Sequence, residues 1–161
     1  MVSIPMCRSG SGKSTIGQQL AQALGWPFAD GDRFHPPANI ARMQQGIPLT
    51  DEDRYPWLQA LRAHIETCLQ LGISTVLTCS ALKRAYREYL MRDEAEIRLV
   101  YLQGDCALIR ARLLQRQEHF MPAGLLASQF AALEEPEQGV IIDIGQPPET
   151  IVALIRAELG V

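Results

Sequence analysis

The chain has 161 residues, of which 47% are apolar and 20% are charged. A chain of this length can bury about 70% of its unfolded surface without disulfides or metals, so we expect one domain over residues 1–161. Fifteen Lys and Arg against eighteen Asp and Glu leave a net charge of −3. This balance argues against nucleic acid or a membrane surface as a partner, and an anionic substrate would have to be bound by local cations.

No apolar stretch approaches the ~20 residues that a membrane-spanning helix needs. Residues 1–8 also lack the apolar segment of a signal peptide, so a cytoplasmic location is expected. The four cysteines, Cys7, Cys68, Cys79 and Cys106, show no zinc-ligand spacing and lie in or beside apolar segments. They are predicted to be reduced thiols that pack as small hydrophobic side chains.

Short apolar runs alternate with longer segments of helical period. The runs predict buried strands at residues 2–6, 26–30, 74–79, 97–102 and 140–143. Helices are predicted at residues 13–24, about 54–71, 82–92, 106–117 and from the prolines at 147 and 148 to 159. This alternation predicts an α/β fold with a parallel sheet covered on both faces. Pro5 cannot donate to a strand ladder, so the first strand either pairs irregularly or begins later.

A glycine-rich loop follows the first predicted strand and leads directly into a helix. It reads Ser9, Gly10, Ser11, Gly12, Lys13, Ser14 and Thr15. In this setting the backbone N–H groups, the helix dipole and the Lys13 charge can bind the phosphates of ATP, and Ser14 can ligate Mg²⁺. The alternative is a helix-capping turn. The full phosphate-loop pattern has glycine where this chain has Cys7, which Arg8 follows.

The second predicted strand ends in the run Asp30-Gly31-Asp32, which carries two carboxylates. At the carboxyl end of a parallel strand they would lie close to the phosphate loop. Asp30 is predicted to hold metal-bound water, and Asp32 is predicted to orient and deprotonate an attacking hydroxyl. Aspartates that merely form a turn beside Gly31 are the alternative.

Further motifs in chain order are Asp30-Gly31-Asp32, His35-Pro36, Asn39, Met43, Gly46-Ile47-Pro48-Leu49, Asp51-Glu52-Asp53-Arg54, Pro56-Trp57-Leu58, Cys79-Ser80-Ala81-Leu82-Lys83, Tyr86-Arg87, Gly104-Asp105, His119-Phe120-Met121-Pro122 and Ser128-Gln129-Phe130. Together with the phosphate loop, they resemble the gluconate kinases of the shikimate-kinase-like branch of P-loop kinases over nearly the whole chain. The resemblance implies a three-layer fold with a five-stranded parallel sheet, a substrate-binding helical segment at about 33–72 and a helical lid at about 112–128. It also implies transfer of phosphate from ATP, with Mg²⁺, to D-gluconate, which gives 6-phosphogluconate. Family members are commonly homodimers.

The resemblance assigns the substrate to Asp32, His35, Arg42, Arg54, Lys83, Arg87 and His119. Arg112 and Arg116 lie four residues apart and would share one helix face, as arginines of a lid over the nucleotide. The alternatives are solvated side chains for these arginines and Lys83, and a helix-capping role for His35. Trp26 and Trp57 are predicted to serve in packing.

Two other functions fit the same motifs. The acceptor could be shikimate or a nucleoside monophosphate, which a screen of acceptors would distinguish. The chain could instead be a nucleotide-binding paralogue with little turnover, as the side chains of Cys7 and Arg8 in the phosphate loop suggest.

Overall fold

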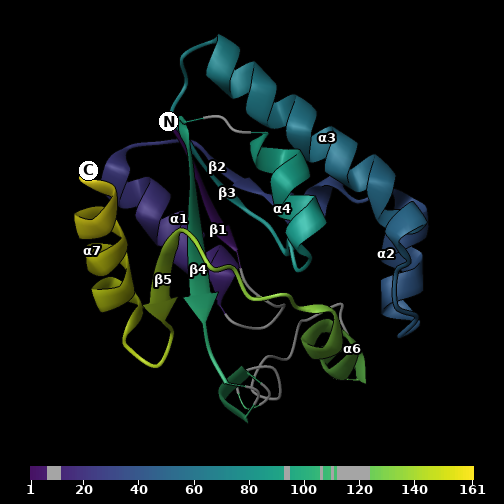
Figure 1. Ribbon diagram of the computed structural model, residues 1–161. Helices are drawn as coiled ribbons and strands as arrows, with labels where there is room; N and C mark the ends of the chain where they lie inside the picture. Colours follow the sequence, from purple (N-terminus) through teal and green to yellow (C-terminus); the bar gives the residue numbers. More distant parts are fainter. Residues whose placement is uncertain (7–11, 93–94, 106, 110, 112–123) are drawn as a thin grey trace.

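The computed structural model describes residues 1–6, 12–92, 95–105, 107–109, 111 and 124–161. Its sheet has five strands in the order β2-β3-β1-β4-β5, and all neighbouring strands are parallel. The strands are β1 (Val2–Met6), β2 (Phe28–Asp30), β3 (Thr75–Thr78), β4 (Ile97–Gln103) and β5 (Val140–Asp143). The helices are α1 (Lys13–Leu24), the short 3-10 helix η1 (Gly31–Phe34), α2 (Pro37–Gln44), α3 (Asp51–Gln70), α4 (Arg84–Met91), α6 (Gly124–Ala132) and α7 (Pro148–Leu159) (Figure 1).

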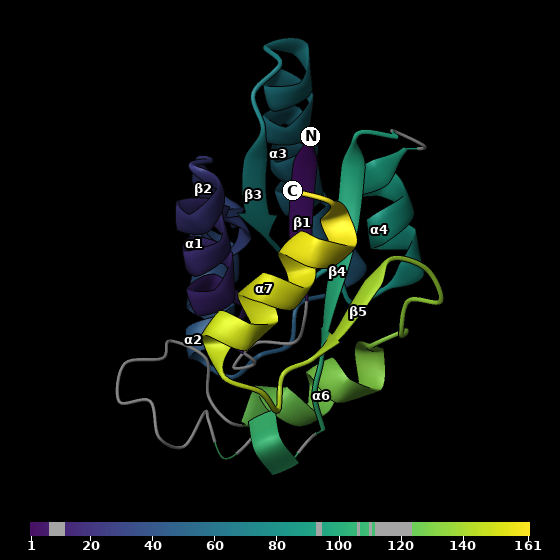
Figure 2. The ribbon, with the colours of Figure 1, turned by 90° about the vertical axis from the view of Figure 1, so that its left-hand side faces the viewer.

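Helices cover both faces of the sheet, as the alternating pattern predicts. Helices α1 and α7 pack together on one face, and α3 and α4 pack together on the other (Figures 1 and 2). Each layer has its own core, because strands that are buried on both sides direct alternate residues to opposite faces. Val76 belongs to the α1–α7 core, and its neighbour Leu77 belongs to the α3–α4 core.

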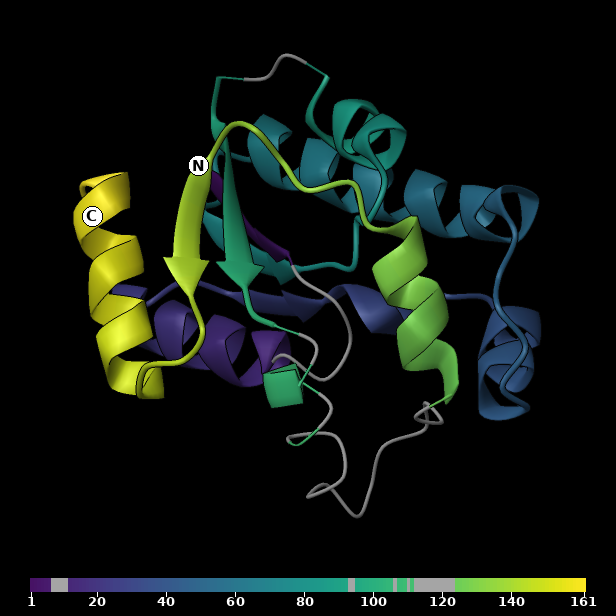
Figure 3. The same ribbon diagram turned by 60° about the horizontal axis from the view of Figure 1, so that its bottom comes forward.

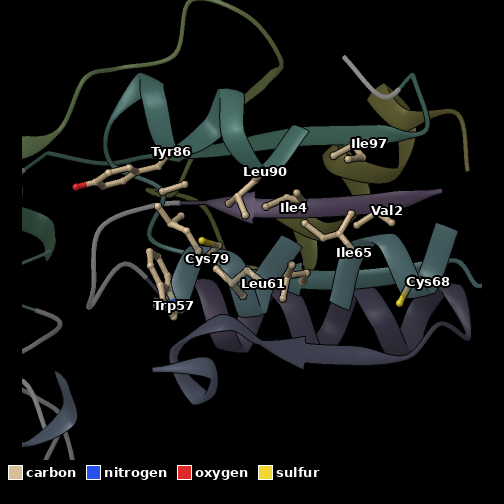
Figure 4. Close-up of a cluster of buried hydrophobic side chains, with 13 residues drawn as sticks. Val2, Ile4, Trp57, Leu61, Ile65, Cys68, Cys79, Tyr86, Leu90 and Ile97 are labelled. Carbon is tan, nitrogen blue, oxygen red and sulfur yellow. The ribbon is translucent and has the colours of Figure 1, made fainter. Parts of the chain in front are cut away.

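The core beneath α3 and α4 runs along β1 and reaches Cys79, which follows β3. Trp57, Leu61 and Ile65 of α3 are almost completely buried in this core, which also contains Val2 and Ile4 of β1 (Figure 4). Cys68 and Cys79 belong to the same core as free thiols, as expected for two of the four cysteines. Because this core is closely packed, it holds α3, and with it Trp57, rigidly against the sheet, near the carboxyl end of β1 that precedes the phosphate loop.

Strand β1 is central although it contains Pro5. On one side it pairs with β4 along its whole length, from Val2 to Met6. On the other side its ladder with β3 stops at Ser3, and the Pro5 carbonyl then accepts a hydrogen bond from the Cys79 N–H at 3.1 Å. The missing proline N–H therefore faces β3, and irregular pairing, one of the two expected alternatives, accommodates it.

Some helix and strand boundaries differ from the predictions. Helix α3 begins at residue 51 rather than 54 because Thr50 and Asp53 form a reciprocal capping box, with N···O distances of 2.9 and 3.1 Å. Strand β2 begins at residue 28 rather than 26, since the Trp26 N–H bonds back to Ala21 at the end of α1. The predicted ranges of β1, β5 and α1 match the observed bounds.

The structure describes helices in both segments that the resemblance implies, the substrate-binding segment and the lid. Helices α2 and α3 lie within the predicted substrate-binding segment, and α2 has no counterpart among the helices expected from periodicity alone. Helix α6 begins within the predicted lid and lies at the end of the molecule where β4 and β5 finish (Figure 3). Among the helices that the structure describes, none has the length and apolar character to cross a membrane.

Candidate active site

The phosphate loop meets helix α1 at Gly12 and Lys13. Gly12 adopts a left-handed backbone with φ 90°, a conformation that glycine reaches without strain. Lys13 is the first residue of α1, and its side chain is only 5% exposed. Its Nζ lies 3.5 Å from Oδ2 of Asp32, so the loop cation and the predicted base are neighbours.

Ser14 and Asp30 form an oxygen-rich pair beside this junction. The Ser14 hydroxyl donates to Oδ2 of Asp30 at 3.1 Å. That bond directs the hydroxyl proton toward Asp30, which leaves the oxygen lone pairs of Ser14 available to a cation. A hydroxyl and one carboxylate fit Mg²⁺, which usually takes its other ligands from water and phosphates. Among the described residues, no group of three or more His, Cys, Asp or Glu side chains is placed to hold a metal ion.

The two aspartates differ in their surroundings. Oδ1 of Asp30 accepts the backbone N–H of Asp32 at 3.1 Å, so both oxygens of Asp30 are hydrogen-bonded. Gly31 between them is tightly packed, since an added Cβ would lie 2.2 Å from the carbonyl oxygen of Thr78. Asp30 is thereby held by hydrogen bonds from the Ser14 hydroxyl and the Asp32 backbone, while the Asp32 carboxylate faces Lys13.

His35 lies next to this pair and is held by an aromatic stack. Its ring lies parallel to the Trp57 indole, with centroids 4.5 Å apart and planes 9° apart. The Trp57 Nε1–H donates to the Gly31 carbonyl at 2.8 Å. Trp57 therefore packs in the core, as predicted, and also supports His35, which the sequence did not reveal.

Burial lowers the pKa of His35 to about 4. The negative charge of Asp32 opposes this shift, whereas the positive charges of Arg54 and Lys13 add to it. The imidazole is consequently neutral near physiological pH.

The His35 pKa predicts acid-sensitive stability. Between pH 4 and the ordinary value of 6.5, the unfolded chain binds a proton at His35 that the folded chain does not. Stability should therefore fall as the pH drops through this window. We expect the urea midpoint to fall less in His35→Gln than in the wild type over the same window. Equal pH dependence in the two proteins would contradict the low His35 pKa.

Arg54 adds positive charge near His35. Its guanidinium carbon lies 5.7 Å from the centroid of the Tyr86 ring. Its Nε is buried and makes no hydrogen bond to any described residue, and the Ser80 hydroxyl after β3 is in the same situation. Buried polar atoms without partners are costly, so both are suited to meet a polar ligand.

Known proteins resemble this chain over most of its length. The family model for shikimate kinase matches residues 9–139. The chain is 48% identical to the gluconokinase of Gluconobacter oxydans over 152 residues, which covers 92% of this chain and 85% of that relative. The chain belongs to the gluconokinase family.

Solved structures of related kinases show the same fold. A sugar kinase from Janibacter sp. matches with a TM-score of 0.92 and 44% identity, covering 99% of this chain and 94% of that one. A gluconokinase from Sinorhizobium meliloti matches with a TM-score of 0.87 and 40% identity, covering 99% and 90%. The predicted three-layer P-loop kinase fold and membership of the gluconokinase family are both confirmed, and the chain is a phosphotransferase.

Three other predicted substrate residues of this gluconokinase-family chain contact protein groups. Nη1 of Arg42 lies 3.3 Å from the Asp53 carboxylate. Nζ of Lys83 lies 2.7 and 2.9 Å from the two oxygens of Asp51. Arg87 is 7% exposed and donates to the carbonyls of residues 81 and 82 at 3.2 and 3.0 Å. Their contacts with a substrate remain predictions.

Asp51 connects helix α3 to the loop after β3, a link that sequence reasoning missed. The Tyr86 hydroxyl and the Lys83 ammonium both donate to its carboxylate. The hydrogen bond from Lys83, followed by that from Tyr86, lowers the pKa of Asp51. The network ties α3 to the segment that follows β3, although Asp51 and Lys83 lie 32 residues apart in the chain.

Glu134 holds the same loop from the other direction. Its N–H donates to the Leu82 carbonyl at 2.9 Å, and its carboxylate accepts the Arg84 N–H at 2.5 Å. Arg87 also donates to the Leu82 carbonyl. The segment after α6 therefore supports the residues that follow β3.

Several predicted site residues lie outside the described residues. They are Ser9, Gly10, Ser11, Arg112, Arg116 and His119, together with Cys7, Arg8 and Cys106. Thr15 is described and is an exposed residue of α1. A groove of 940 Å³ lies between α4 and residues 134–140, and Arg87 alone of the described predicted site residues lines it.

Proposed function

We propose that this chain catalyses the ATP- and Mg²⁺-dependent phosphorylation of D-gluconate to 6-phosphogluconate. The observation that carries the proposal is the pairing of Lys13 with Asp32 at 3.5 Å, in a chain 48% identical to a gluconokinase over most of its length. This pairing puts the cation of the phosphate loop beside a carboxylate that can take a hydroxyl proton. In-line phosphoryl transfer needs the cation that binds the phosphates and the carboxylate that accepts the hydroxyl proton to lie close together.

Each residue of the site has a separate role in the proposed reaction. Lys13 stabilises the negative charge that spreads over the β and γ phosphates as the bond to the leaving oxygen breaks. Asp32 orients the 6-hydroxyl and accepts its proton. Ser14 and Asp30 would hold Mg²⁺ and its water, and the bound ion would neutralise phosphate charge. Helix α1 supplies the positive end of its dipole at the same place.

Arg54 is suited to bind an acceptor that carries a carboxylate. A sugar acid needs its carboxylate neutralised, and a guanidinium is suited to this by its charge and donor geometry. The Arg54 Nε has no hydrogen-bond partner among the described residues, whereas Arg42 and Lys83 already pair with Asp53 and Asp51. Arg54 is therefore our candidate for the gluconate carboxylate.

ADP release with and without acceptor tests the function. We expect turnover with gluconate and Mg²⁺, and little with shikimate or a nucleoside monophosphate. Preference for another acceptor would leave the kinase assignment intact and overturn the substrate. ATP binding with no acceptor-dependent ADP release would instead favour a nucleotide-binding paralogue. The homodimer and the cytoplasmic location remain predictions.

Replacing Arg54 by methionine is expected to raise KM for gluconate by about 10- to 100-fold, the effect of losing a charged hydrogen bond. KM for ATP should change little, since Arg54 belongs to the acceptor side. Arg156→Met on α7 is the matched control, because its exposed side chain bonds only to the Val161 carbonyl among the described residues. An unchanged KM for gluconate in Arg54→Met would exclude Arg54 as the carboxylate ligand.

A further inference from the structure

Asn39 of α2 connects His35 to helix α3. Its side chain is 5% exposed, and its Nδ2 lies 2.7 Å from the Asp53 carbonyl and 3.3 Å from Nδ1 of His35. A carbonyl oxygen only accepts hydrogen bonds, so the amide atom that faces Asp53 must be the nitrogen. The same NH₂ group then has a second hydrogen available for His35. The backbone of α3 thus determines which way the Asn39 amide is oriented.

That orientation determines the protonation of the His35 ring. Because the Asn39 NH₂ group donates, Nδ1 of His35 has to accept, and an accepting ring nitrogen carries no proton. The single proton of the neutral ring is then on Nε2. An imidazolium, or the opposite tautomer, would set an N–H against the amide N–H.

The surroundings of the ring favour the same form. The charged groups that act on it are Asp32 of η1, Arg54 of α3 and Lys13 of α1. Burial and the two cations outweigh the attraction of Asp32 for a proton, so the pKa is lowered to about 4. The stack on Trp57 holds the plane of the ring. Nε2 makes no hydrogen bond to any residue that the structure describes.

We propose that Asn39 is a positioning residue that holds His35 as the neutral Nε2–H tautomer, so that His35 donates a hydrogen bond to a hydroxyl oxygen of the acceptor. In this arrangement His35 is neither a base nor a cation for the substrate carboxylate. Asp32 is then the proton acceptor of the site, and Arg54 neutralises the acid group. The choice of a polyol acid as the acceptor rests on the proposed function, whereas the tautomer does not.

The tautomer can be measured on the wild-type chain without substrate. Long-range ¹H–¹⁵N correlation spectra of ¹⁵N-histidine-labelled protein distinguish the two neutral tautomers and the imidazolium. Signals of His35 are identified by their loss in His35→Gln, and those of His64 by their loss in His64→Gln. We expect His35 to show the Nε2–H form near neutral pH. The opposite tautomer or an imidazolium would overturn the proposal.

Asn39→Asp tests the link itself. A carboxylate accepts a hydrogen bond, so it should draw a proton onto Nδ1 and change the spectrum of His35. KM for gluconate should rise by about tenfold, with a smaller change in kcat, because one hydrogen bond to bound substrate is lost. An unchanged spectrum in folded Asn39→Asp would overturn the proposal.

A pair of His35 variants separates donation from packing. Glutamine can place an amide NH₂ near the position of Nε2, whereas asparagine reaches only about as far as Nδ1. We expect His35→Gln to keep KM for gluconate within about threefold of the wild type, and His35→Asn to raise it by about tenfold or more. Equal losses in both variants would overturn the donor role.

The two proposals fail in different ways. If the wild type does not phosphorylate gluconate but His35 shows the Nε2–H form, the proposed function fails and the tautomer assignment stands. If gluconate is phosphorylated and His35 shows another form, the function stands and the assignment fails.

Discussion

Lys13→Ala should lower kcat by about 10³-fold, the effect of removing one preorganised charge from a transition state. The Lys13 ammonium lies beside Asp32 at the start of α1, where the phosphates would bind. The loss should appear in steady-state turnover of gluconate at saturating ATP. The far-ultraviolet circular dichroism should not change, because the side chain belongs to the site rather than to either apolar core.

Two controls define the result for Lys13. Arg156→Ala removes an exposed cation from α7 and should retain wild-type turnover, which excludes a general effect of net charge. Lys13→Arg keeps the charge but changes its position, so most of the loss should persist if geometry matters. Wild-type turnover in Lys13→Ala would remove Lys13 from the transfer site.

Asp32→Asn should lower kcat by about 10²- to 10⁴-fold while ATP affinity stays within a few-fold of the wild type. The amide has nearly the same shape as the carboxylate but cannot accept the hydroxyl proton, so the chemical step is affected. Single-turnover kinetics and calorimetric titration with ATP separate the two effects.

Asp30→Asn is the matched comparison for Asp32→Asn. Asp30 accepts hydrogen bonds from the Ser14 hydroxyl and from the Asp32 N–H, so its replacement should raise the Mg²⁺ concentration needed for activity. Asp32→Asn should leave that requirement nearly unchanged. The reverse pattern, with a metal defect in Asp32→Asn and a proton-transfer defect in Asp30→Asn, would exchange the two roles.

Contacts in the structure distinguish the predicted substrate residues from one another. The sequence places five predicted substrate residues after strand ends or on the helices that follow them, namely His35, Arg42, Arg54, Lys83 and Arg87. In the structure, Arg42 and Lys83 pair with carboxylates, Arg87 bonds to carbonyls, and the Nε of Arg54 has no partner among the described residues. Charge compensation between segments distinguishes these residues, and sequence spacing does not encode it.

Local patterns were sufficient to predict all five strands and several of the helices, although not α2. Helix α1 and strand β5 have the bounds that periodicity predicts, because burial on both faces and a helical apolar stripe leave a direct record in the sequence. The capping box of Thr50 and Asp53 was also a readable local signal, although the start of α3 was predicted at Arg54. Lys13, Ser14 and Asp32 were predicted from their neighbours in the chain, and the structure places Lys13 beside Asp32 and Ser14 beside Asp30, while their roles stay predictions.

Only the tertiary structure decided how distant segments combine. It made β1 a central strand despite Pro5, by turning the missing N–H toward β3, where the ladder is already interrupted. It also joined Asn39 to the Asp53 carbonyl and stacked His35 on Trp57, and the two together determine the state of that ring. These contacts depend on how α2 and α3 pack against each other and against the residues that follow β2. A sequence records which groups are present, whereas their hydrogen-bond partners and their burial, and so their protonation, depend on the completed packing.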